Sequence, residues 1–209
     1  MQTNEFGLNF VEFEGEIYYI MEKGITTADF IIPQNIVLKK LATYLFEQKE
    51  KMSFGDIVIC IQAFHNTPRY FRHETAKIFV DYLIDNLYIS PDAIFTLRWL
   101  LPVQCSILRG LKRQREAIAI FEKERKRIEN KEPLILPGIS MKEPGDFILI
   151  TKYWTTSVSA AYCDLGDKER AIEVLEMCEF SANDTESDLF QSLLGRIRSN
   201  EKSADRKLY

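Results

Sequence analysis

The chain has 209 residues, with 27 Lys and Arg against 31 Asp and Glu, which gives a formal net charge of −4. Its apolar fraction of 46% and charged fraction of 28% are close to the averages of soluble globular proteins, so extensive disorder is excluded. With only 9 Gly and 7 Pro, a collagen-like or low-complexity chain is excluded as well. The length fits one large domain or two small ones.

The sequence shows neither a secretory signal nor a membrane-spanning stretch. The N-terminus lacks the basic and apolar regions of a secretory signal, and the longest apolar stretch, residues 56–64, is too short to span a bilayer. Four cysteines, Cys60, Cys105, Cys163 and Cys178, are far apart within apolar patterns, which is typical of buried free thiols. We therefore expect a cytoplasmic protein that has no membrane contact.

Residues 1–33 favour β-structure. Residues 8–21 are rich in aromatic and β-branched side chains around Gly15, which can adopt a positive φ in a tight turn. This pattern predicts a hairpin of residues 8–13 with 16–21, packed on the helices that follow. The apolar phase changes along the first strand, so either a bulge interrupts the pairing or both faces are covered.

Residues 34–130 are predicted to be helical. Ser53 is a good N-cap, and residues 90–92 (Ser-Pro-Asp) are a strong helix start signal. Pro102 either kinks its helix or opens a new one. Apolar residues at i, i+3 and i+4 predict helices near residues 34–51, 53–66, 70–86, 91–101, 103–111 and 113–130.

The rest of the chain begins with a loop. Residues 131–145 contain three Pro and two Gly, which is typical of a long loop or a domain boundary. A C-terminal helical region over residues 146–199 follows, and a polar tail at residues 200–209 is expected to be flexible. The predicted C-terminal helices are residues 146–165, 167–180 and 184–199. We expect all these parts to form one continuous domain.

One segment carries a specific pattern. Residues 159–176, SAAYCDLGDKERAIEVLE, resemble the central part of a tetratricopeptide repeat (TPR), in which two antiparallel helices meet at a Gly-Asp turn. Gly166 supplies a permissive backbone at the helix end, and Asp167 can cap the next helix. Ala171 is small where the two helices approach most closely, and Tyr162 fills the gap between helices.

A second, weaker copy covers residues 105–122. Ala117 stands in the place of Ala171, and Lys112 stands where the turn glycine is expected. The two alanines are 54 residues apart, which is longer than the period of about 34 residues in the TPR family. The loop at residues 131–145 would be the insertion that accounts for the excess. A generic antiparallel helix pair with a glycine turn gives a similar pattern.

The resemblance implies a mainly α fold of stacked antiparallel helical hairpins, a TPR-like α–α superhelix, with the N-terminal β-hairpin added. TPR proteins bind peptides in a groove lined by the first helix of each pair. Carried over position by position, the partner-binding residues would be Trp99, Ser106, Arg109, Tyr153, Thr156 and Cys163.

Charge is unevenly distributed along the chain. Residues 109–127, the basic segment, carry eight bases and three acids, whereas residues 164–188, the acidic segment, carry nine acids and two bases. Such segments can steer a charged partner or a second copy of the chain. Alternatively, they are solvated helix faces with i,i+4 pairs such as Glu122 with Lys126.

Residues for catalysis are scarce. His65 and His73 are the only histidines, and neither has a third ligand at helical spacing, so no metal site is expected. The sequence has no phosphate-binding loop, nucleophile elbow or Cys-x-x-Cys pair. We therefore predict no catalytic residue and no cofactor.

These observations predict a non-catalytic protein–protein interaction module of the adaptor, chaperone or inhibitor (immunity) type. Its partner would be another protein or a peptide, and self-association through the basic and acidic segments is a further expectation. The alternative is a nucleic-acid-associated regulator that uses the basic segment, although a sequence pI of about 5.4 speaks against it.

Overall fold

The computed structural model divides the chain into two compact units, residues 1–90 and 91–206. Their boundary precedes residues 131–145, where the sequence suggested one. The described residues are 1–86, 93–130, 132, 135–136, 139–140, 150–177 and 186–199. The helix start signal at residues 90–92, most of the loop, Cys178 and the tail at residues 200–209 lie outside them.

The described chain is mainly helical, with an antiparallel sheet at its N-terminus, which confirms the α-rich part of the predicted fold. The helices are α1 (Asn35–Glu47), α2 (Phe54–Asn66), α3 (Arg72–Asp85), α4 (Ala93–Gly110), α5 (Gln114–Glu129), α6 (Lys152–Leu165), α7 (Lys168–Glu176) and α8 (Glu186–Ser199), with a 3₁₀ turn at Lys49–Lys51. The strands are β1 (Gln2–Thr3), β2 (Asn9–Phe13), β3 (Glu16–Met21), β4 (Gly24–Thr27), β5 (Ile135–Leu136) and β6 (Ile139–Ser140).

The predicted hairpin is confirmed as β2 and β3, and it belongs to a larger sheet of order β1-β2-β3-β4. Its pairing is regular, with Val11 opposite Tyr18, so no bulge interrupts it. Glu14 and Gly15 take positive φ values of 52° and 82° at the turn. Tyr18 and Ile20, two residues apart on β3, are buried, and this fixes the inner face of the sheet.

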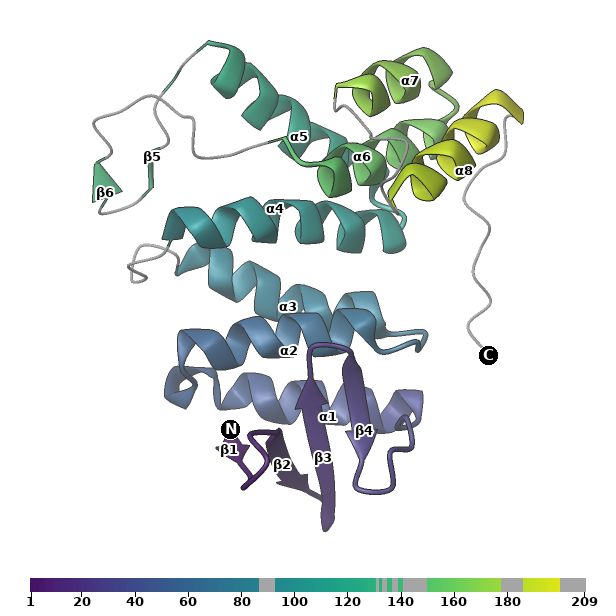
Figure 1. The fold of residues 1–209 in the computed structure, drawn as a ribbon. Helices are drawn as coiled ribbons and strands as arrows, with labels where there is room; N and C mark the ends of the chain where they lie inside the picture. Colours follow the sequence, from purple (N-terminus) through teal and green to yellow (C-terminus); the bar gives the residue numbers. More distant parts are fainter. Residues whose placement is uncertain are drawn as a thin grey trace. The chain divides into compact units, whose positions relative to one another are not determined.

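In the first unit, β3 and β4 pack against α2, and Figure 1 shows the turn between the two strands at α2. The predicted N-cap Ser53 is confirmed and forms a capping box with Asp56. The edge of β4 is closed by α2, because the buried Thr67 hydroxyl accepts the Ile25 N–H at 2.9 Å and donates to the Ala63 carbonyl. The edge of β4 is therefore not open for another strand at this point.

In the second unit, α4 is one continuous helix, so the prediction that residues 91–101 and 103–111 are separate helices is wrong. Pro102 lies inside it. A proline in a helix interior costs about 3 kcal/mol. The apolar stripe of Leu97, Leu100 and Leu108 continues across Pro102 and is buried. Burial of each leucine contributes about 1.5–3 kcal/mol, which outweighs the cost of the break.

The helices of the second unit stack in order. The α4–α5 and α6–α7 pairs are helical hairpins; α6 packs against both helices of the first pair, and α8 packs against both helices of the second. Fully buried Trp154 meets the ring of Phe121 edge-on at 5.3 Å. Helix α6 begins at Lys152, later than the expected residue 146, and residues 146–149 lie outside the described part.

Candidate functional site: a repeated helical hairpin

The turn between α6 and α7 has the geometry that the sequence predicts. Gly166 has a φ of 86°, in the left-handed region, and its N–H donates to the Cys163 carbonyl at 3.0 Å. The Asp167 N–H donates to the Tyr162 carbonyl at 3.0 Å, which completes the glycine-based helix stop. The Asp167 carboxylate accepts the Arg170 N–H at 3.1 Å and so caps α7.

The turn between α4 and α5 repeats this geometry without a glycine. Lys112, 54 residues before Gly166, has a φ of 60°. Its N–H donates to the Arg109 carbonyl at 3.0 Å, and the Arg113 N–H donates to the Leu108 carbonyl at 2.8 Å. Each of these donors and acceptors lies 54 residues before its counterpart in the second turn. The turn is therefore duplicated.

A hydrogen bond inside each hairpin is duplicated too. The Cys105 thiol donates to the Ala117 carbonyl at 3.4 Å, and the Ser159 hydroxyl donates to the Ala171 carbonyl at 2.6 Å. All four residues are buried, so the small alanines stand where the two helices meet, as the sequence predicts. The pairs are again 54 residues apart. The sequence pattern pairs the two alanines but does not indicate the donors, Cys105 and Ser159, that face them.

The surroundings of the cysteine thiols are those of structural residues, not of reactive nucleophiles. The indole N–H of Trp154 donates to the Cys105 sulfur at 3.2 Å, and burial raises the pKa of Cys105 to about 12. Burial likewise raises the pKa of Cys60 to about 12. Both stay neutral thiols near pH 7, so neither has the thiolate character of a nucleophile. As expected, Cys60, Cys105 and Cys163 are buried, and none of the three forms a disulfide.

A polar network joins the two hairpins. The Tyr162 hydroxyl on α6 donates to Glu122 on α5 at 3.0 Å. Arg125 on α5 pairs with Glu122 at 2.9 Å and with Glu173 on α7 at 3.2 Å. Arg170 also pairs with Glu173. Burial, followed by the hydrogen bond to Glu122, raises the pKa of Tyr162 to about 12.

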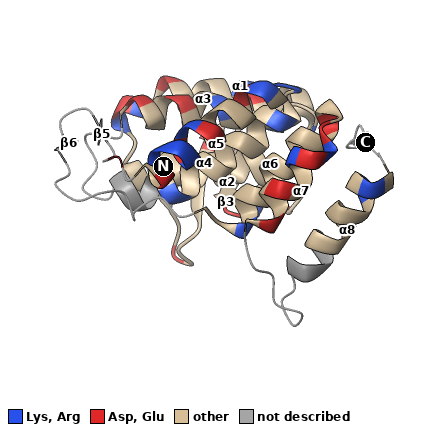
Figure 2. Ribbon diagram, turned by 90° about the horizontal axis from the view of Figure 1, so that it is seen from above, with Lys and Arg blue, Asp and Glu red and all other residues tan. Residues whose placement is uncertain are grey.

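The basic and acidic segments therefore meet inside one molecule. Arg125 belongs to the first and Glu173 to the second. Within α5, the largely buried pair of Arg127 and Glu124 lies at 2.8 Å. Figure 2 shows blue and red residues together on α5 and on α7. Charges paired in this way are less available to phosphates or to a second copy.

Five of the six predicted partner-binding residues are at least partly exposed on neighbouring helices. Trp99, Ser106 and Arg109 lie on α4, and Tyr153 and Thr156 lie on α6. Tyr153 is 45% exposed.

Cys163 differs from the prediction. It is only 4% exposed and packs in a cluster that contains Leu193 and Ile197 of α8. It does not line an open groove, because α8 covers this end of α6. The sequence predicts the helix at residues 184–199 but not where it packs.

The histidines lie together in the first unit. The rings of His65 and His73 are 5.6 Å apart, and the Arg72 Nε–H donates to His73 Nε2 at 3.2 Å. Within the described part of the chain, no three His, Cys, Asp or Glu side chains form a cluster that could hold a metal ion.

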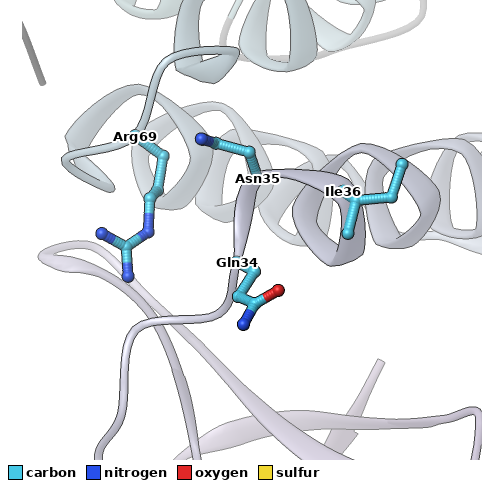
Figure 3. Close-up of a pocket in the computed structure, with 4 residues that line it drawn as sticks. All are labelled: Gln34, Asn35, Ile36 and Arg69. Carbon is cyan, nitrogen blue, oxygen red and sulfur yellow. The ribbon is translucent and has the colours of Figure 1, made fainter. Parts of the chain in front are cut away.

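A further surface of the first unit was missed by sequence reasoning. The Arg69 guanidinium donates to the carbonyls of Pro33 and Ile32, each at 2.8 Å. The Tyr70 N–H donates to the Asn35 side-chain oxygen at 3.0 Å. These bonds tie the α2–α3 turn to the start of α1. An open pocket of about 480 Å³ lies there, lined by Gln34, Asn35, Ile36 and Arg69 (Figure 3).

Comparison with family models, with curated proteins and with solved structures finds no match to the chain. The resemblance to the TPR family therefore depends on the residues and on the repeated hairpin geometry. No helix among the described residues is both long and apolar enough to cross a membrane.

Proposed function

We propose that the chain is a non-catalytic protein-binding protein whose second unit is a short TPR-like repeat array. The duplicated hairpin carries this proposal. Two pairs of helices share the same left-handed turn and the same buried hydrogen bond at a constant offset of 54 residues. Stacked helical hairpins of this kind create extended surfaces for partner binding.

The proposed binding surface consists of the partly exposed side chains on α4 and α6. Trp99, Arg109 and Tyr153 are of the residue types that contribute most to the binding energy of protein interfaces. Helices α4 and α6 pack side by side, so one extended peptide could contact both. In this proposal the partner is a protein or peptide, and the protein works in the cytoplasm without a cofactor.

The test is capture of partners from the native cell by the full chain, with mass spectrometry as the readout. The double variant Arg109→Glu with Tyr153→Ala is expected to lose the captured partner while its helical content and melting stay unchanged. Leu165→Ala is the matched control, because Leu165 is on the same helix as Tyr153 and is similarly exposed, at 47% against 45%. It is expected to keep the partner.

Retention of the partner by the folded double variant would contradict the proposed surface. An equal loss in Leu165→Ala would place the effect outside it. Recovery of nucleic acid in the capture, lost steeply as salt is raised, would favour the nucleic-acid alternative.

A further inference from the structure

Large apolar side chains are exposed around the Arg69 pocket of the first unit. Phe30 is 70% exposed, Ile31 63%, Ile36 60% and Tyr70 65%. They belong to two segments, residues 28–36 and the α2–α3 turn, that the Arg69 bonds hold together. We call these four residues and Arg69 the Arg69 patch. Exposed apolar patches mark interaction sites in soluble proteins.

The loop at residues 27–31, which carries Phe30 and Ile31, is held in a strained backbone conformation. The Thr27 N–H donates to the Ile31 carbonyl at 2.8 Å, and the Phe30 N–H donates to the Thr27 carbonyl at 2.9 Å. Phe30 has a φ of 60°, and its ring stacks with that of Tyr19 at 6.4 Å. An aromatic residue in the left-handed region is strained by about 1–3 kcal/mol, and such strain concentrates at functional sites.

The patch also carries positive charge that no described carboxylate neutralises. Two of the nitrogens of Arg69 donate to backbone carbonyls, and no acidic side chain among the described residues lies within ion-pair distance of it. The ammonium of Lys39 lies 5.2 Å from the centre of the Phe71 ring, and it too pairs with no carboxylate in the described part. An occupant should therefore bring negative charge.

We propose that the Arg69 patch binds a linear segment of a partner protein in which one acidic side chain is flanked on both sides by apolar ones. The remaining Arg69 N–H groups would receive the carboxylate, since guanidinium–carboxylate bonds are strong and directional. Figure 3 shows Arg69 reaching from the α2–α3 turn toward the segment of Gln34 and Asn35, whose amides also offer N–H donors.

The arrangement favours an internal segment over a chain end. Phe30 and Ile31 come before the two carbonyls that Arg69 holds, and Ile36 comes after them. The carbonyls that Arg69 holds thus lie between apolar residues along the chain, whereas a terminal carboxylate has a neighbouring side chain on one side only. This inference is independent of the function proposed for the second unit.

The test is fluorescence polarisation with the full chain and an array of labelled, end-capped pentapeptides. Each peptide has a central Glu between varied apolar residues, and each is paired with the same peptide carrying Gln. Glu-containing members are expected to bind about tenfold or more tightly than their Gln partners, because a hydrogen bond to a charged group contributes about 1.5–3 kcal/mol. Binding is expected to weaken with salt.

Variants locate the site. Ile36→Ser and Tyr70→Ser change exposed side chains, so folding is retained, and each is expected to weaken binding about tenfold. Lys39→Glu is expected to weaken it through charge. Leu165→Ser, which changes an exposed apolar residue of the second unit outside both proposed surfaces, is the matched control and is expected to bind like the unaltered chain.

Four outcomes would overturn the proposal. They are the absence of Glu-dependent binding across the array, an equal loss in the Leu165→Ser control, sedimentation with phosphatidylserine vesicles in place of peptide binding, and dimerisation that Ile36→Ser and Tyr70→Ser abolish. The third result would assign the patch to a lipid surface, and the fourth would assign it to a second copy of the chain.

Discussion

The same chemical change, Gly to Ala, is expected to have opposite effects at two positions of the second unit. Gly166 ends α6 with a φ of 86°, and a Cβ added there meets no atom within 4 Å. Gly195 lies in α8 at an exposed position, also with no atom within 4 Å of an added Cβ. Steric clash is thus absent at both, and only the backbone conformation differs.

The expected magnitudes follow from this difference. A left-handed residue with a Cβ costs about 1–2 kcal/mol, and Ala recovers about 0.4–1 kcal/mol by restricting the unfolded chain. Gly166→Ala should therefore destabilise by about 1 kcal/mol. Gly195→Ala should stabilise by roughly the same amount, because Ala is the better helix former. Lys112→Gly should also stabilise, since Lys112 holds a φ of 60°.

Tryptophan fluorescence during urea denaturation measures these effects selectively. The chain has two tryptophans, Trp99 and Trp154, and both belong to the second unit. The midpoints are expected to move by roughly 0.3–0.7 M, given the denaturant sensitivity of a domain of this size. The double variant of Lys112→Gly with Gly166→Ala should return near the starting midpoint, because the turns lie in different hairpins.

Two results would refute the reasoning. If Gly166→Ala raises the midpoint as Gly195→Ala does, the left-handed turn is not held in solution. If Lys112→Gly lowers the midpoint, the lysine side chain contributes more to the free energy of unfolding than its left-handed backbone costs. The two turns are then not equivalent.

Three other perturbations have distinct readouts. Cys105→Ala is expected to cost about 1–3 kcal/mol, because the buried Trp154 N–H loses its acceptor, whereas Cys105→Ser keeps one and should cost less in the same urea assay. The stability of the second unit should fall as the pH rises from 10 to 12, because the unfolded chain releases the Tyr162 proton first; Tyr162→Phe should make this fall shallower. Thr67→Val should speed hydrogen exchange at the Ile25 amide, whose acceptor it removes, while Thr67→Ser leaves it slow.

Features set by neighbours in the sequence could be predicted. Ser53 and Asp56 form their capping box three residues apart, and Gly166 and Asp167 form their turn from adjacent positions. The β-hairpin follows from a similar local signal at Glu14 and Gly15. In each case the interacting groups are close along the chain, so the residue types at these positions are enough to predict the local geometry.

Features set by tertiary packing could not be predicted. Lys112 carries no residue-type sign of a left-handed backbone, yet it adopts one in the hydrogen-bonded turn between α4 and α5. Pro102 would break an isolated helix, yet burial of the surrounding stripe keeps α4 continuous. By analogy with TPR proteins Cys163 would line the groove, but in the structure α8 covers it. The Arg69 patch depends on bonds between residues 36 and 37 positions apart.

The distribution of paired charge separates the two proposed surfaces. The basic and acidic segments hold most of the uneven charge of the sequence. They meet through the pair of Arg125 and Glu173, which joins the two hairpins. Arg125 and Glu173 compensate each other's charge, so we expect recognition on α4 and α6 to depend on aromatic contacts such as Tyr153. Arg69 and Lys39 have no compensating carboxylate in the described part of the chain. Binding at the first unit should therefore weaken as salt is raised, and more steeply than binding at the second unit, whose proposed surface has one charged residue, Arg109.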